Sequence, residues 1–150
     1  MSAADRKKVR EAIQKYAKAA AWEAKCIREN SPPDYGYLRA HLRGYILSKY
    51  MMPEDECRSD AIAALTEASL ARMMRVTPER AAQLDTARSC AGATSATVKK
   101  ALLFQAMERE LQIVLPAAET VAARDVTALA KLILRCRAQQ PAPVLTNGTF

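Results

Sequence analysis

The sequence predicts an all-α protein. Half of its 150 residues are hydrophobic, alanine is abundant and only 4 residues are glycine. That composition suits helices packed on helices and leaves little material for β-structure. Apolar residues also recur at three- and four-residue spacing between prolines and polar capping residues, which marks out several separate helices.

The first predicted helix covers residues 5–29. Its apolar residues form one stripe, which usually packs into a core or against another helix. The stripe consists of Val9, Ile13, Tyr16, Ala20, Ala24 and Ile27. Most of the basic residues lie off it. Pro32 and Pro33 then end this helix because they cannot continue its backbone hydrogen bonding.

Asp34 can cap a second helix, in which Leu38, Leu42, Tyr45 and Ile46 advance by three and four residues. A third helix is predicted to begin at Pro53, because proline followed by acidic residues favours a first turn. Apolar residues from Ile62 to Val76 carry this helix to about residue 75. Thr77 and Pro78 open a short helix through Leu84, and a polar connection over residues 85–95 follows.

The next helix is predicted from Ala96, with Pro116 marking the break after it. Its expected buried stripe is Val98, Ala101, Leu102, Met107 and Leu111. Asp125 is a natural N-cap for the last helix, in which Val126, Leu129, Leu132 and Ile133 follow at helical spacing. Residues 139–150 contain two prolines and no periodicity, which predicts a flexible tail.

The pattern around this break resembles the second half of acyl carrier proteins. The residues that carry the resemblance are Leu103, Met107, Glu108, Glu110, Leu111, Leu115, Pro116, Val126, Leu129 and Ile133. They fall in register without a gap over about a quarter of the chain. The resemblance implies a small helical bundle over residues 53–138 that docks partner enzymes, for example acyl-transfer or biosynthetic enzymes.

Acyl carrier proteins attach phosphopantetheine to the serine of an Asp-Ser-Leu triplet at the start of this helix. The gapless register places Thr97 at that serine and leaves no acidic neighbour. A slip of two residues matches the stretch from Gly92 to Ser95 and makes Ser95 the attachment point. The slip rotates the helix by about 200°. The resemblance therefore leaves Ser95 and Thr97 as alternative attachment residues for phosphopantetheine, and we favour a degenerate carrier without a prosthetic group.

Charge is a second departure from the family. Lys99 and Lys100 open a helix that is acidic in typical carriers, so they should attract an acidic partner. Residues 1–52 hold 11 basic residues against 5 acidic ones, whereas residues 53–150 hold 12 against 11. The basic character of the chain therefore belongs to its N-terminal third.

Basic and aromatic residues also alternate around the second helix. Arg39 and Arg43 lie among four tyrosines, Tyr35, Tyr37, Tyr45 and Tyr50. Such interleaving is typical of single-strand nucleic-acid surfaces, which stack bases and pair phosphates. Tyrosines at helical spacing are more often core-edge residues with a hydrated hydroxyl group. Both interpretations stay open, and Arg39 and Arg43 are candidate partner contacts.

The chain offers no catalytic constellation and no metal-binding pattern. Its four cysteines are scattered without a Cys-x-x-Cys pair, and His41 has no Glu or His at helical spacing. We expect no enzyme activity, and reduced thiols in a cytoplasmic protein without a membrane-spanning segment.

Together these observations predict a basic two-helix extension over residues 1–52, a carrier-like bundle over 53–138 and a tail over 139–150. The extension either packs onto the bundle or pairs with a second copy in a homodimer. The function we expect is a non-catalytic, carrier-like protein that docks partner enzymes. The alternative is a basic helical module that binds nucleic acid or an acidic protein.

Overall fold

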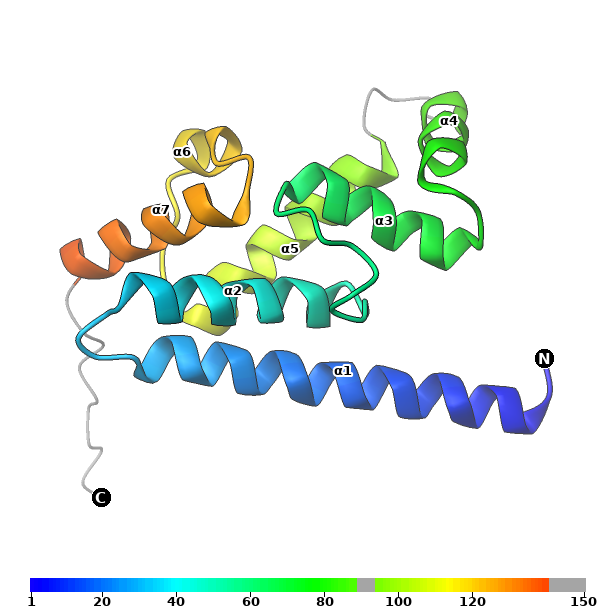
Figure 1. Ribbon diagram of the computed structural model, residues 1–150, viewed down its shortest axis with the longest axis horizontal. Coiled ribbons are helices and arrows are strands. Elements are labelled where there is room, and N and C mark those ends of the chain that lie inside the picture. Colours follow the sequence, from blue (N-terminus) through cyan, green and yellow to red (C-terminus); the bar gives the residue numbers. More distant parts are fainter. Residues whose placement is uncertain (89–93, 141–150) are drawn as a thin grey trace, which may run out of the picture.

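The computed structural model describes residues 1–88 and 94–140, and these residues fold into helices without a β-sheet (Figure 1). The prediction of an all-α fold is therefore confirmed. The helices are α1 (Ala3–Glu29), α2 (Tyr35–Lys49), α3 (Ile62–Met74), α4 (Pro78–Arg88), α5 (Ser95–Leu111), α6 (Ala117–Ala122) and α7 (Val126–Gln139). None of the described helices is long and apolar enough to cross a membrane. The predicted tail lies mostly outside the described residues, since the description stops at residue 140.

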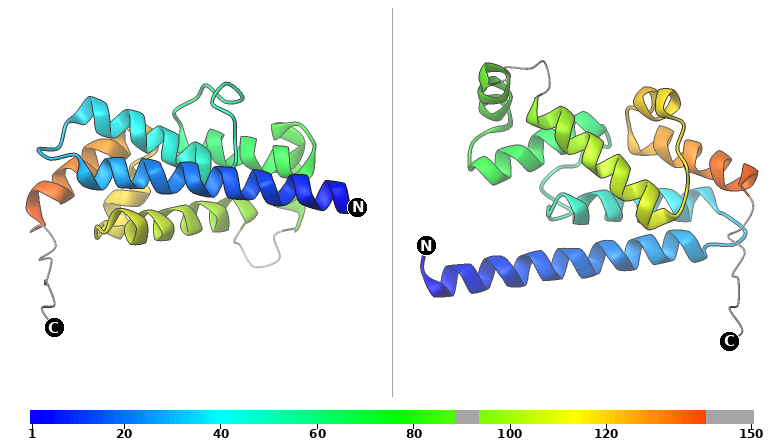
Figure 2. Two further views of the ribbon diagram at one scale, coloured as in Figure 1. Left: turned by 90° about the horizontal axis from the view of Figure 1, so that it is seen from below. Right: turned by 180° about the vertical axis from the view of Figure 1, so that it is seen from behind.

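Helices α1 and α2 form an antiparallel pair along one side of the molecule (Figures 1 and 2). Asp34 caps α2 as predicted, since its Oδ2 accepts a hydrogen bond from the Tyr37 amide at 2.8 Å. The pair approaches closely at Gly44, where a β-carbon would overlap the carboxylate of Glu23. A glycine inside a helix is destabilising relative to alanine, and here it leaves room for that carboxylate.

One hydrophobic core extends from α1 to α7. Helix α2 contributes its whole inner face and packs against α7 as well as α1. The largest fully buried side chains include Ile27, Tyr45, Leu65, Met107 and Ile133, which come from five different helices. Residues 1–52 and residues 53–138 therefore share this core.

Two guanidinium groups fix the last turn of α1 to the rest of the core. Arg137 of α7 donates to the carbonyl oxygens of Ile27 and Arg28, where the last turn of α1 leaves carbonyls without helical partners. Arg28 in turn donates to the Glu110 carbonyl oxygen at 2.6 Å, near the end of α5. The last turn of α1 is thus fixed to both α5 and α7.

The predicted helix start at Pro53 is wrong. Only one turn forms there, with the Glu56 amide donating to the Pro53 carbonyl oxygen at 3.3 Å, and the chain stays irregular until α3 begins at Ile62. Residues 57–60 are instead fastened by arginine side chains of α2. The Ile62 amide also bonds to the Arg124 carbonyl oxygen at 2.9 Å, which fixes the start of α3 against the start of α7.

The predicted buried stripe of α5 is also wrong in part. Met107 and Leu111 are buried, but Val98 and Leu102 are 49% and 59% exposed, and Leu103 and Ala106 face the core instead. The core-facing side of α5 is therefore rotated by about one residue from the stripe that the spacing favours. The spacing of apolar residues in α5 fits two faces of the helix almost equally well, and packing against the neighbouring helices determines which face is buried.

Candidate functional site

The start of α5 carries the two candidate attachment residues. Thr94 caps the helix through its side chain, which accepts from the Thr97 amide at 3.1 Å. The Asp85 carboxylate of α4 accepts from the Ser95 amide at 2.7 Å and from the Ala96 amide at 3.1 Å. These amide bonds, that of Ala96 foremost, hold the pKa of Asp85 below its usual value. An ionised Asp85 therefore sits at the positive end of the α5 dipole.

Ser95 and Thr97 differ in how they present their hydroxyl groups. Both residues are exposed; the Thr97 hydroxyl shares a hydrogen bond with the Thr94 hydroxyl at 3.0 Å, and the Ser95 side chain bonds to the Asp85 carboxylate. Phosphopantetheine needs an accessible hydroxyl group at a helix start, and the exposed primary alcohol of Ser95 fits that requirement. Residues 92 and 93, which lead into Ser95 in the carrier-like pattern, lie outside the described residues, as does Cys90.

Lys99 and Lys100 point to different sides of α5. The Lys99 ammonium group lies 5.0 Å from the centre of the Tyr50 ring, and burial lowers the pKa of Lys99. It borders a shallow pocket of about 330 Å³ with Lys49, Leu102 and Arg109. Lys100 instead borders a second pocket, between α3, α5 and α6. The two lysines therefore do not form one patch.

Arg39 and Arg43 are occupied within the chain. Both pair with the carboxylate of Asp60, and Arg43 also donates to the carbonyl oxygens of Cys57 and Ser59 at 2.6 and 2.9 Å. These contacts fasten the connection between α2 and α3. Of the surrounding tyrosines, Tyr45 and Tyr50 are buried in the core and cannot stack on bases, whereas Tyr37 is exposed.

A histidine–carboxylate pair lies on the outer face of the α1–α2 pair. His41 Nδ1 and Glu23 Oε2 are 2.6 Å apart, and the rings of Trp22 and Tyr37 stack around the imidazole at 5.5 and 4.1 Å between centroids. The sequence offered His41 no acidic partner at helical spacing, because Glu23 comes from the neighbouring helix. Only the fold could reveal this pair.

The apolar stripe of α1 is covered over just half of its length. Ala20, Ala24 and Ile27 are at most 3% exposed, whereas Val9 and Ile13 are 48% and 50% exposed. The cause is the length of α2, which runs antiparallel to α1 and ends at Lys49, so that α1 extends past it (Figure 1). All residues from 1 to 11 are exposed. The N-terminal part of the apolar stripe is therefore exposed to solvent.

Basic side chains border this uncovered stripe along one edge. At 100° per residue, Arg6 and Arg10 lie about 40° and 80° from the centre of the stripe at Val9 and Ile13. The other basic residues of this half lie about 120–160° from the stripe, on the opposite face of the helix; they are Lys7, Lys8, Lys15 and Lys18. Residues 3–18 hold six basic and two acidic residues, a balance of +4. One of the acids, Asp5, is engaged by the Ser2 cap.

The strongest pKa shifts inside the fold belong to residues with a structural role. Burial and a hydrogen bond to Glu110 raise the pKa of Tyr45, and Lys49 pairs with the same carboxylate at 3.3 Å. Among the residues that the structure describes, no group of histidine, cysteine and acidic side chains is arranged to hold a metal ion.

No protein-family model matches the chain, and neither the curated proteins nor the solved structures contain a match to it. The resemblance to acyl carrier proteins therefore stays a prediction.

Proposed function

We propose that the protein is a non-catalytic binding protein whose partner is an acidic, amphipathic helix of another protein, docked along the N-terminal half of α1. The observation that carries this proposal is the uncovered stripe at Val9 and Ile13, bordered by Arg6 and Arg10 on a helix half with a net positive charge. The same stripe, further along the helix, is buried against α2 and the core. Helix α2 covers the apolar stripe of α1 only as far as Lys49 reaches, and a partner helix would cover the remaining part.

Charge selects the partner. A second copy of the chain would place one surface of charge +4 against another, and like charges across an interface suppress association. An acidic partner gains from the basic edge at Arg6 and Arg10 instead. Nucleic acid would also satisfy the charge, but its phosphate backbone offers no apolar surface for Val9 and Ile13. An amphipathic helix with acidic borders matches both the stripe and the charge.

The test uses a synthetic helical peptide with leucines at heptad positions a and d and glutamates at e and g. Its binding is followed by fluorescence anisotropy of a label on the peptide. Val9→Ser combined with Ile13→Ser should weaken binding about tenfold or more, since each side chain loses on the order of 1 kcal/mol of apolar burial. The fold should persist, because both residues lie outside the core.

Charge variants separate a defined interface from general attraction. Arg6→Glu with Arg10→Glu reverses the two residues that border the stripe, and Lys7→Glu with Lys18→Glu reverses the same number of charges on the opposite face. The border pair should weaken binding at least several times more than the opposite pair. Equal losses, or tight binding of duplex DNA that is insensitive to the Val9 and Ile13 changes, would overturn the proposal in favour of a polyanion binder. If the protein is a dimer and the Val9→Ser and Ile13→Ser changes dissociate it, the stripe mediates self-association instead.

A second candidate is the carrier-like function, supported by the exposed hydroxyl of Ser95 at the start of α5. In that case a phosphopantetheine arm on Ser95 would carry an acyl group while partner enzymes perform the chemistry. Intact mass after treatment with a broad-specificity phosphopantetheinyl transferase and coenzyme A tests it. A gain of one phosphopantetheine, lost in Ser95→Ala and kept in Thr97→Val, supports the carrier. An unchanged mass leaves the binding protein without a prosthetic group.

We place either function in the cytoplasm. The described cysteines Cys26, Cys57 and Cys136 are all free, as expected in a reducing compartment.

A further inference from the structure

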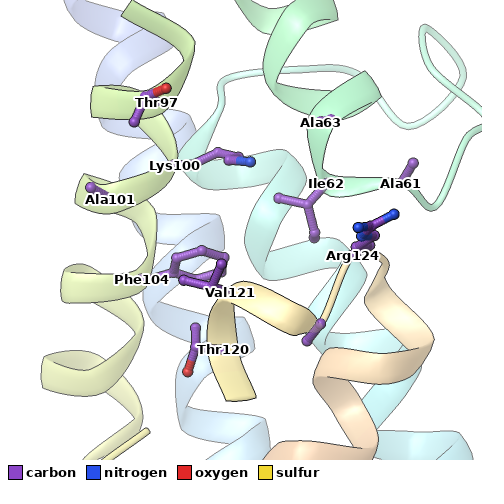
Figure 3. Close-up of a pocket in the computed structure, with 11 residues that line it drawn as sticks. Ala61, Ile62, Ala63, Thr97, Lys100, Ala101, Phe104, Thr120, Val121 and Arg124 are labelled. Atoms are coloured by element: carbon purple, nitrogen blue, oxygen red, sulfur yellow. The ribbon is translucent and has the colours of Figure 1, made fainter. Parts of the chain in front are cut away.

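A surface pocket of about 560 Å³ lies between the start of α3, the middle of α5 and α6 (Figure 3). Its walls are mainly apolar and include Ile62, Phe104 and Val121. Its size is in the range typical of small-molecule sites. No residue of α1 lines the pocket, so it is separate from the proposed partner surface.

Two cations border this apolar pocket. Lys100 extends from α5 toward Ile62, and Arg124 lies on the other side, beside Ala61 (Figure 3). Neither forms an ion pair with any residue that the structure describes. The carboxylate of Asp60, whose carbonyl oxygen accepts from the Val126 amide close to Arg124, pairs with Arg39 and Arg43. Asp125 likewise caps α7 through the Ala128 amide at 2.7 Å.

The start of α3 adds to the positive field. Ala61 occupies the N-cap position without a side-chain hydrogen bond, and Ala61 and Ala63 both line the pocket. The Ile62 amide already donates to the Arg124 carbonyl oxygen. The next first-turn amides, those of Ala63 and Ala64, have no partner within the helix and favour a negative charge. Two cations and a helix start therefore surround one end of an apolar pocket that contains no acidic residue in its lining.

We propose that this pocket binds a small amphipathic carboxylate non-covalently. The carboxylate group would lie between Lys100 and Arg124, and an apolar chain would extend along Phe104, Ile62 and Val121. Charge-assisted hydrogen bonds orient the head group, while burial of the chain supplies most of the affinity. Arg124 suits the head group because its guanidinium can bind both carboxylate oxygens.

The experiment titrates decanoate, below its aggregation concentration, into the full chain and follows the backbone amides by NMR. Saturable shifts should appear at Ala63 and Ala101 and not at the indole of Trp22, which packs on His41 of α2 and does not line the pocket. Decanol, which has the same chain without the charge, should bind at least tenfold more weakly. Acetate, which has the charge without the chain, should not saturate.

Lys100→Gln combined with Arg124→Gln should weaken decanoate binding at least tenfold. The matched control is Lys131→Gln with Arg135→Gln, which removes two exposed charges from α7 and should change the affinity less than twofold. Thermal melts of both variants confirm that the fold is retained. Ala101→Phe, which fills the pocket without changing its charge, should abolish the shifts.

Three results would overturn the proposal. Equal affinity for decanoate and decanol would mean an apolar surface without a carboxylate site. Equal losses in the two charge variants would mean general attraction to a basic protein. Shifts spread over other helices, with Ala101→Phe binding normally, would place the ligand elsewhere. These outcomes concern α3, α5 and α6 alone and leave the peptide test on α1 unaffected.

Discussion

The two halves of α1 have the same sequence pattern and opposite environments. Ile27 and Ile13 occupy the same apolar stripe, yet Ile27 is fully buried and Ile13 is half exposed. The C-terminal half is covered by α2 and fixed by side chains from other helices. The N-terminal half depends on its own hydrogen bonds and cap. The comparison shows that an apolar stripe indicates which residues a helix can bury. The neighbouring elements determine how much of the stripe is actually buried.

The largest expected effect comes from removing side-chain volume in each half. Ile27→Ala should lower the free energy of unfolding by about 2–5 kcal/mol, because it leaves a cavity in the core. Ile13→Ala should change it by less than about 0.5 kcal/mol, as is usual at exposed positions. Urea denaturation followed by circular dichroism measures both. A similar loss in the two variants would contradict the division of the helix.

The next effect concerns the tie between α7 and the end of α1. Arg137→Ala leaves the carbonyl oxygens of Ile27 and Arg28 without their donor, and should cost about 1–3 kcal/mol. Arg135→Ala is the matched control, since Arg135 is exposed and should be nearly neutral. Equal melting temperatures for the two variants would show that the tie contributes nothing to stability.

A smaller and local effect is expected at the start of the helix. Ser2 and Asp5 form a reciprocal capping box, in which the Asp5 amide donates to the Ser2 hydroxyl at 3.1 Å. Ser2→Ala should weaken the first turns by about 1 kcal/mol. Because no core contacts depend on these turns, amide hydrogen exchange should speed up before Tyr16 and stay unchanged after Ala20. Faster exchange throughout α1 would mean that the two halves unfold together.

The sequence predicted the features that depend on neighbouring residues. The caps at Asp34 and Asp125 are found where they were expected, because a cap needs only the amides of the following turn. The predictions from sequence failed where residues distant in the chain determine the local structure. Pro53 precedes acids as a helix start should, but arginine side chains of α2 hold the residues that follow in an irregular path.

The candidate sites divide in the same way. Ser95 and Thr97 do lie in the first turn of α5, a local property. Arg39 and Arg43 could not be recognised as structural from their spacing, because Asp60 reaches them across a loop. Likewise, Arg124 and Lys100 line one pocket only because the fold brings α5 beside α3 and the segment that precedes α7. No local signal marks such a pocket.

The smallest effect is a pH dependence confined to the N-terminal half. Hydrogen bonds from Ser2, first its side chain and then its amide, hold the pKa of Asp5 below its usual value near 3.8. A carboxylate with a lowered pKa stabilises the folded helix above the unfolded pKa, and this contribution is lost as the pH falls through the folded pKa. Amides before Tyr16 should therefore exchange faster as the pH is lowered below about 4, beyond the intrinsic pH dependence of exchange. Asp5→Asn should exchange faster at neutral pH and lose this acid response, while amides after Ala20 behave alike in both proteins. An acid response of the same size in Asp5→Asn would assign it to other carboxylates, and the N-terminal half would then depend on more than its own cap.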